Sequence, residues 1–399
     1  MEVFSIGLTD IFLLVLYILF IIWWGLKNGK SADSQSYFLA GRSMPWWIVG
    51  LSLFAASISS TTLIGQSGDA YHTGVAVFNY NATGVVVMVF FAVCLLPLYI
   101  RSNIFTIPEF LEKRFDKRSR YYFSAICIIG NIFLDAAGAL YAGALIIKLI
   151  YPEASLQLII LIFAALAASY TIPGGLSSVI KTEIIQAIIL LLGSVILTFF
   201  CIQKGGDYFV DLFRKGDILA KLIRPLDDSS TPWLGLIVGM PVLGIYFWAN
   251  NQTLVQRVLS AKSVDEGRKG ILFNGFLTLT TLFIIAIPGL IARGLFPNLS
   301  SPDMVYPTMV VNLLPVGMLG IILAALLSAL MSALSAILNS TSTLFTMDFY
   351  SQFYPGSDSK KIVYTGKIAA LVIIGIAALW APQIGRFGSL LKYYQEMLS

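Results

Sequence analysis

Apolar stretches long enough to cross a lipid bilayer recur along almost the whole chain, and this feature constrains the fold more than any other. A spanning helix needs about 20 mostly apolar residues, and the first such stretch covers residues 8–27. Only 12% of the 399 residues are charged, whereas soluble domains carry about a quarter. Because backbone hydrogen bonds in lipid must be satisfied within each segment, we predict an all-α, polytopic membrane protein.

We predict ten spans, and an eleventh that begins near Phe387. They cover residues 8–27, 44–69, 75–100, 119–149, 155–172, 179–203, 234–256, 269–293, 307–345 and 361–382. Residues 1–30 are interpreted as an extra N-terminal transmembrane helix and not as a cleavable signal. They begin with Glu2 and Asp10 in place of a basic segment, and no small-residue cleavage pattern follows.

The distribution of lysine and arginine predicts the orientation in the inner (plasma) membrane. Loops after odd-numbered spans hold most of the 26 basic residues, and the densest run extends from Lys113 to Arg120. Positively charged loops stay in the cytoplasm, so the N-terminus is expected outside. Residues 204–232 would then form the largest extracellular loop.

Cysteine and histidine usage argues against an enzyme or a metal centre. Cys94, Cys127 and Cys201 lie within apolar runs without paired spacing, so we interpret them as small core residues. His72 is the only histidine, and no nucleophile–base constellation is visible. The net charge of +5 is spread over several loops and indicates no nucleic-acid partner.

Two predicted spans carry polar or helix-breaking runs inside apolar sequence. The second span contains the hydroxyl-rich run 57–62, and the seventh contains Gly-Met-Pro within 239–244 followed by Asn-Asn-Gln at 250–252. Non-helical backbone at membrane depth is tolerated only where protein or a water-filled cavity meets its polar groups, and paired interruptions indicate a transporter site. Their spacing predicts inverted five-helix repeats at residues 37–203 and 233–399, the last helix being incomplete. Ordinary serine and proline kinks remain the alternative.

Six motifs resemble those of sodium:solute symporters, closest to the sodium–glucose cotransporter branch. They are YFLAGRSMPWW (37–47), TIPEFLEKRF (106–115), IPGGLSSVI (172–180), VQRVLSAKS (255–263), YPT (306–308) and LNSTSTLFTMDFY (338–350). The resemblance extends from Tyr37 to Gln395 and implies a LeuT-type fold with sodium-coupled symport by alternating access. Family members usually continue for three or more helices, so we expect a chain truncated at its C-terminus relative to the family.

The resemblance implies a sodium ion as the coupling ion, held between the second and ninth spans. Sodium prefers oxygen ligands, which broken helices and hydroxyl groups supply. The family motif places these ligands at the carbonyls of Ala55, Ile58 and Ala329 and at the hydroxyl of Ser332. Glu183 falls where relatives carry an acid associated with sodium passage.

The sequence departs from the family motif at Ala333, where relatives carry a second hydroxyl. Ser328 and Ser335 share a helical face with Ser332, and either could compensate. The departure leaves two alternatives open: a proton-coupled or uncoupled carrier of the same fold, and a solute sensor that does not transport.

The resemblance to sugar carriers also implies a substrate site for a small polar solute, sugar acids included. Its residues would be Ser57, Thr62, Asn81, Phe247, Trp248, Lys269 and Gln395. Asn81 replaces a glutamate of the sugar carriers, and Phe247 is a candidate inner gate where relatives often have tyrosine. The hydroxyl run 59–62 is more similar to carriers of sialic acid or monocarboxylates.

Asp135 lies in the middle of the fourth predicted span and has no counterpart in the motif. Ionisable groups inside lipid are costly and usually functional. We predict that Asp135 contacts the substrate, by binding hydroxyls or an amine, or that it carries a proton. A structural carboxylate bonded to Asn131, one turn earlier, is the alternative.

Overall fold

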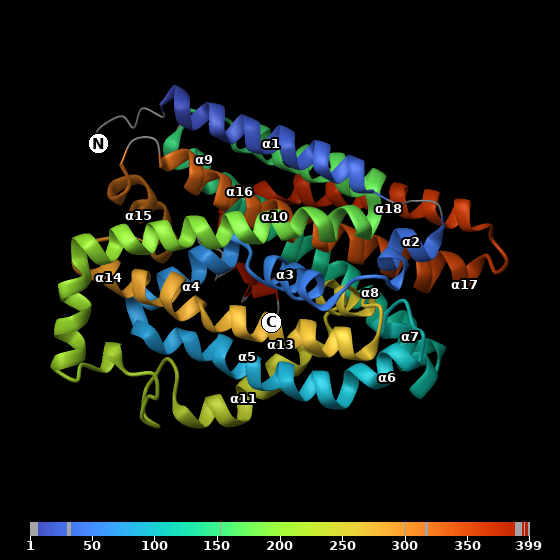
Figure 1. Ribbon diagram of the computed structural model, residues 1–399, viewed down its shortest axis with the longest axis horizontal. Helices are drawn as coiled ribbons and strands as arrows, with labels where there is room; N and C mark the ends of the chain where they lie inside the picture. Colours follow the sequence, from blue (N-terminus) through green and yellow to red (C-terminus); the bar gives the residue numbers. More distant parts are fainter. Residues whose placement is uncertain are drawn as a thin grey trace.

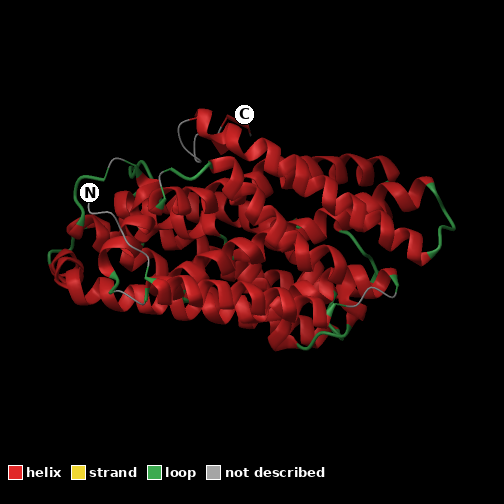
Figure 2. Ribbon diagram, turned by 90° about the horizontal axis from the view of Figure 1, so that it is seen from above, coloured by secondary structure: helices red, strands yellow, loops and turns green. Residues whose placement is uncertain are grey.

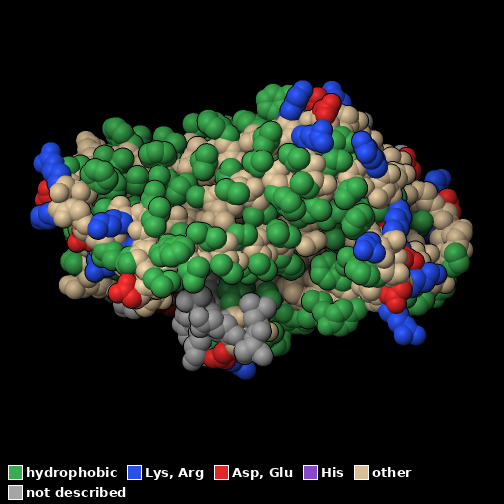
Figure 3. All heavy atoms as spheres, turned by 90° about the horizontal axis from the view of Figure 1, so that it is seen from below, with side chains coloured by type: hydrophobic (Ala, Val, Ile, Leu, Met, Phe, Trp, Pro, Cys, Tyr) green, Lys and Arg blue, Asp and Glu red, His purple; other side chains and the backbone are tan. Residues whose placement is uncertain are grey.

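A computed structural model describes residues 7–29, 33–151, 153–299, 301–315, 318–387, 393–394 and 396–397. Within these residues the regular structure is helical, apart from two isolated bridges (Figure 2). Eight helical stretches are long and apolar enough to cross a membrane. Hydrophobic side chains cover the middle of the face in Figure 3, and charged ones gather towards both ends. These features confirm the prediction of an all-α, polytopic membrane protein.

The first predicted span is helix α1 (Leu8–Asn28), which lies along one edge of the bundle beside α10 (Leu156–Arg214) (Figure 1). Both of its ends are bonded to the bundle. Asp10 Oδ1 accepts from the backbone amide of Gly320 (2.8 Å), near the start of α16 (Leu319–Leu344). Ser178 Oγ donates to the carbonyl of Gly25 (2.8 Å). The extra helix is therefore a packed part of the bundle.

The second predicted span is broken into two helices. Helix α3 (Trp46–Ser57) ends at the extended residue Ile58 (φ −100°, ψ 94°), and α4 (Ser60–Thr73) begins two residues later. Ser59 caps the new helix: its Oγ accepts from the Thr62 amide (3.2 Å), and its own amide donates to Thr62 Oγ1 (3.3 Å). The hydroxyl run thus satisfies the backbone groups that the break exposes, which confirms this interruption.

The seventh predicted span is also broken, but one of the two expected positions was wrong. Helix α11 (Trp233–Ile245) includes Pro241 without a break and continues as the π-helical η6 (Tyr246–Asn250). A proline is tolerated within a membrane helix when neighbouring groups satisfy the freed carbonyl. The break falls at Asn251 (ψ 114°), whose side chain accepts from the Thr253 amide (2.8 Å) and caps α12 (Gln252–Leu259).

Three predicted boundaries need correction. The span predicted at 307–345 is two helices, α15 (Val305–Leu313) and α16, because Pro315 cannot continue the helix. The spans predicted at 155–172 and 179–203 form the single run α10, broken at Gly175 (φ 60°, ψ −161°). Because α10 continues to Arg214, the first part of the predicted loop 204–232 is helical.

The remaining helices complete the bundle. They are α2 (Ser34–Leu39), α5 (Asn79–Phe90), α6 (Leu96–Arg101), α7 (Ile107–Arg114), α8 (Lys117–Gly130), α9 (Ala137–Ile150), α13 (Val264–Leu279), α14 (Ile287–Leu295), α17 (Ser351–Phe353) and α18 (Ser359–Trp380). Four further π-helical segments continue α5, α8, α13 and α16: η3 (Phe91–Leu95), η4 (Asn131–Ala136), η7 (Leu282–Ala286) and η9 (Phe345–Tyr350). Short 3₁₀ turns are η1 (Ala40–Arg42), η2 (Gly74–Phe78), η5 (Ile218–Ala220), η8 (Pro302–Met304) and η10 (Ala381–Phe387).

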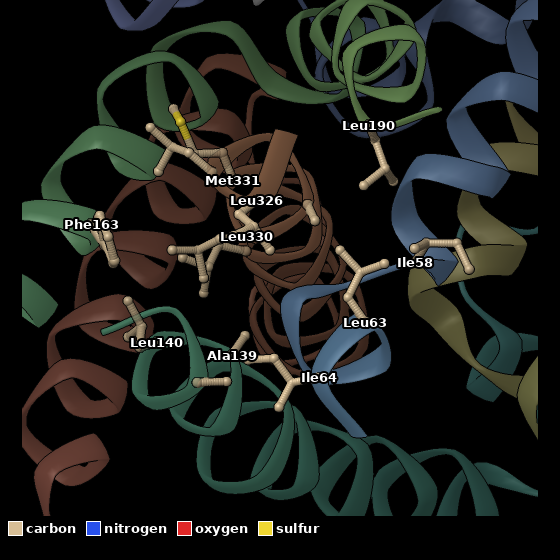
Figure 4. Close-up of a cluster of buried hydrophobic side chains, with 14 of the residues drawn as sticks. Ile58, Leu63, Ile64, Ala139, Leu140, Phe163, Leu190, Leu326, Leu330 and Met331 are labelled. Atoms are coloured by element: carbon tan, nitrogen blue, oxygen red, sulfur yellow. The ribbon is translucent and has the colours of Figure 1, made fainter. Parts of the chain in front are cut away.

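Helix α16 is the centre of the bundle, and 94% of the apolar window of its span is buried. Leu330 and Met331 of α16 lie in one cluster with Phe163 of α10 and Leu140 of α9 (Figure 4). Ile58, the residue at the break between α3 and α4, joins the same cluster. Because packing drives helix association in lipid, the first helix break is fixed directly against the central helix.

Candidate functional site

The break between α3 and α4 and the facing turn of α16 bring oxygen atoms together in the core. Ser332 is 1% exposed, and its hydroxyl donates to the carbonyl of Ala55 (2.9 Å). The same hydroxyl lies 3.1 Å from the carbonyl of Ala329, one turn earlier on α16. Ile58 is the extended residue of the break itself. Residues from both elements thus converge, and their carbonyl and hydroxyl oxygens are ligands that suit sodium.

Neither expected substitute supplies the hydroxyl that Ala333 lacks. The Ser335 hydroxyl donates to the carbonyl of Ser332 (3.1 Å). The Ser328 hydroxyl bonds with the Tyr17 hydroxyl of α1 (2.6 Å) and with the carbonyl of Ala324 (2.7 Å). Both hydroxyls are engaged away from the break, so the oxygen set seen here contains one serine hydroxyl.

Glu183 is engaged in a buried ion pair. Its side chain and that of Arg257 are both fully buried, with Glu183 Oε1 2.5 Å from Arg257 Nη2 and Oε2 3.2 Å from Nε. Ser52 also donates to Oε2, and Arg257 donates to the carbonyl of Thr253. The carboxylate therefore joins α10, α12 and α3, and its predicted role in sodium passage stays a prediction.

Two cavities meet at the first helix break. The larger cavity, of about 360 Å³, is lined by Ser57, Ile58, Thr62, Gln66, Tyr80, Asn81, Gly84, Met240, Leu243, Gly244, Tyr246, Phe247, Trp248 and Thr278. The smaller cavity, of about 170 Å³, is lined by Ala56, Ser57, Ser59, Thr61, Thr62, Asp135, Ala139, Phe247, Asn251, Thr253, Leu254, Ala333, Ile337 and Tyr394. They share Ser57, Thr62 and Phe247, and both broken helices contribute to their walls.

Six of the eight predicted substrate residues line these cavities. They are Ser57, Thr62, Asn81, Asp135, Phe247 and Trp248. Lys269 is exposed near the start of α13 and lines neither cavity. Gln395 lies outside the described residues. The structure thus brings together the candidates on the broken helices and leaves Lys269 apart.

Several residues that line the cavities were not among the predicted substrate residues. Gln66 accepts a hydrogen bond from Asn81 Nδ2 (2.9 Å) and fixes that amide at the cavity wall. Gln66 could have been predicted from the sequence, because it lies one turn after Thr62 on the same helical face. Asn251 belongs to the predicted polar run of the seventh span and Thr253 directly follows that run, whereas Tyr394 reaches the cavity from a segment far along the sequence.

Asp135 belongs to the π-helical η4 and is exposed to the smaller cavity although it lies halfway along its span. π-Helical segments inside α-helices are frequent at functional sites. In the orientation that lets the Asn131 oxygen accept from Thr341 (2.9 Å), the Asn131 amide nitrogen lies 3.3 Å from Asp135 Oδ2. The contact anticipated between Asn131 and Asp135 is therefore compatible with a carboxylate that also faces the cavity.

A second buried acid, Asp348, belongs to the motif at residues 338–350, and the sequence predicted no role for it. It lies in η9 and is fully buried, where Oδ1 accepts from Thr106 (2.7 Å) and Arg120 (2.8 Å) and Oδ2 from Ser124 (2.6 Å). This network fastens the end of the α16 span to α7 and α8, outside the two cavities.

Broken helices around polar cavities at membrane depth define the class: a helical secondary transporter fold. A family model described as the sodium:solute symporter family matches residues 37–399, and the chain belongs to that family.

Comparisons with known proteins agree with this placement. The chain is 36% identical to a sodium/glucose cotransporter of Vibrio parahaemolyticus, over 98% of this chain and 78% of the relative. It is 33% identical to sodium/glucose cotransporter 1 of Ovis aries and to sodium/myo-inositol cotransporter 2 of Homo sapiens, over 98% of this chain in both cases. The chain covers 66% and 64% of these two relatives, slightly less than two thirds of their length.

A solved structure shares the fold. It is described as the substrate-bound outward-open state of a Na+-coupled sialic acid symporter, and it superposes with a TM-score of 0.87 at 23% identity, over 95% of this chain and 83% of that one. The relatives are named as sodium-coupled cotransporters, and membership of the sodium:solute symporter family supports sodium as the coupling ion.

Proposed function

We propose that this protein is a secondary active transporter that couples the uptake of a small polar solute to the entry of sodium. The solute is a sugar or a sugar-like molecule, sugar acids included. The protein works by alternating access in the inner (plasma) membrane, with its N-terminus outside.

The observation that carries the proposal is the contact between Ser332 and Ala55. It joins the central helix to the first helix break, and that break also supplies Ser57 and Thr62 to both cavities. An ion bound at this contact would stabilise the conformation of the break in which Ser57 and Thr62 line both cavities. Coupling requires that each ligand bind one conformation better than the other.

The larger cavity supports a polar, sugar-like solute. Its volume falls within the range of small-molecule sites. Amides at Asn81 and Gln66 can bind hydroxyl groups, and Trp248 can cover the C–H face of a sugar ring. The relatives are named for glucose, myo-inositol and sialic acid, which are all rich in hydroxyl groups.

A thermal-shift screen of the purified full chain tests this proposal. Sugars, sugar acids and amino acids are each added in sodium chloride and in potassium chloride at the same ionic strength. We expect at least one sugar-like solute to raise the Tm in sodium only. A solute that raises the Tm equally in potassium would contradict sodium coupling.

A proton-coupled or uncoupled carrier of the same fold is the second candidate. It is favoured by Ala333, which lines the smaller cavity without a hydroxyl, and by the carboxylate of Asp135 in that cavity. Vesicle uptake driven by a proton gradient without sodium would favour this candidate. Solute binding without counterflow would instead favour a sensor that does not transport.

A further inference from the structure

Asp135 presents a carboxylate to the smaller cavity without a positive partner in the described chain. No lysine, arginine or histidine is among the residues that line this cavity. Asp135 takes part in none of the ion pairs of the described residues. By contrast, the buried acids Glu183 and Asp348 are each paired with an arginine. A carboxylate at membrane depth is costly unless a cation meets it.

The cavity around Asp135 combines aromatic rings with hydroxyl and amide groups. Phe247 and Tyr394 contribute rings, and Ser59, Thr61 and Asn251 contribute polar atoms. The Tyr394 hydroxyl lies directly over Gly138, one turn after Asp135, because a Cβ built on Gly138 would be 2.2 Å from it. The missing side chain at Gly138 therefore leaves room for the Tyr394 ring in the wall of the cavity that Asp135 also lines.

Three cations could meet such a carboxylate: a proton, a metal ion or an ammonium group. Aromatic faces attract organic cations, and ammonium groups are commonly recognised by aromatic rings beside an acid. A bare sodium ion would leave most of a cavity of about 170 Å³ unfilled. The shared walls of the two cavities would let one solute place its hydroxyl-bearing part in the larger cavity and a charged group in the smaller one.

We propose that the solute of this transporter carries a protonated amine, which binds Asp135 between the rings of Phe247 and Tyr394. The expected class is a hydroxylated primary amine of hexosamine size. This inference rests on the proposed function, since it specifies the solute for the same site.

Matched pairs of sugars test the inference on the full chain in sodium. Binding of radiolabelled glucosamine is measured, and glucose and N-acetylglucosamine are added as competitors. The same comparison is made for galactosamine and for mannosamine, each against its parent sugar and its N-acetyl form. An ammonium–carboxylate contact should make at least one amine bind about tenfold or more tightly than both its parent sugar and its N-acetyl form. If every neutral sugar binds as well as its amine, or if no amine binds, the inference is overturned. A sodium-dependent Tm shift with a neutral solute would then still support the proposed function.

Two variants assign the preference to the carboxylate. Asp135→Asn keeps the shape and removes the charge, so the ratio of amine to parent-sugar affinity should fall about tenfold. Asp265→Asn removes a charge from an exposed acid of α13 that pairs with Arg268, and it should leave the ratio unchanged. An unchanged ratio in Asp135→Asn would contradict the inference. So would loss of the Tm shift produced by sodium alone, because sodium would then be the cation at Asp135. Both variants must show a single thermal transition.

Discussion

At the scale of single residues, the Ser332 hydroxyl is the side chain on which the proposed sodium site depends most. It is the only side-chain oxygen found at the contact between Ala55 and Ala329 in the described chain. Ser332→Ala should therefore weaken sodium affinity about tenfold, the effect of losing one good hydrogen-bonding or ligand oxygen. A sodium titration of the Tm, at constant ionic strength, measures it.

The matched control lies on the same helix. Ser342 is equally buried, and its hydroxyl donates only to the carbonyl of Asn339 (3.0 Å), so Ser342→Ala should leave sodium affinity unchanged. Restoring the missing hydroxyl with Ala333→Ser should strengthen sodium binding. Equal sodium affinity in Ser332→Ala and the unmodified protein would exclude Ser332 as a ligand.

The ion pair between Glu183 and Arg257 should matter for folding. Glu183→Ala would leave a fully buried guanidinium without its partner, which costs about 3–5 kcal/mol. We expect a large fall in the Tm, whereas Asp265→Asn, which breaks an exposed pair, should change stability by at most about 1 kcal/mol. If Glu183→Ala were no less stable than Asp265→Asn, the pair would have no structural role.

The sequence predicted which residues belong to the site better than it predicted the side chains with which they interact. Ser57, Thr62, Phe247 and Trp248 were predicted because the resemblance to sugar carriers places substrate-binding residues at these positions, and all four line the cavities. Arg257 was missed as the partner of Glu183, since 74 residues separate them and only the packing of α10 against α12 brings them together.

At the scale of elements, Gly175 sets the bend between the two halves of α10. It has a positive φ of 60°, and a Cβ there would lie 2.6 Å from both Cδ2 and the carbonyl oxygen of Tyr37. Gly175→Ala should therefore lower stability by roughly 1–3 kcal/mol through backbone strain and steric overlap. The Tm measures this loss.

Gly375 of α18 provides the control for that substitution. A Cβ built on Gly375 meets no atom within 4 Å, and its backbone is helical, so Gly375→Ala should be neutral or should stabilise by up to about 1 kcal/mol. Equal effects of the two alanine substitutions would show that the bend does not require glycine.

Helix breaks were predictable where the side chains themselves cap the new helix. The hydroxyl run at 57–62 and Asn251 both do so, and both coincide with true interruptions. Pro241 was misleading because a proline removes one donor without supplying a cap, and the helix continues past it. The break near Pro315 was missed because the surrounding sequence remains apolar on both sides.

At the scale of the whole molecule, the length and order of apolar segments were enough to predict a polytopic bundle. They could not predict which helix lies at the centre. The apolar window of the α16 span is almost as hydrophobic as that of the α10 run by mean hydropathy, yet a far larger share of it is buried. Central position depends on how all the helices pack, and composition alone does not encode it.

Transport in proteoliposomes that contain the full chain tests sodium-coupled symport directly. Uptake of the solute identified by the thermal-shift screen is followed under an inward sodium gradient, and separately under an inward proton gradient without sodium. We expect the solute to accumulate above equilibrium with the sodium gradient only, and to accumulate less in Ser332→Ala. Accumulation driven equally by protons in the absence of sodium would contradict this expectation.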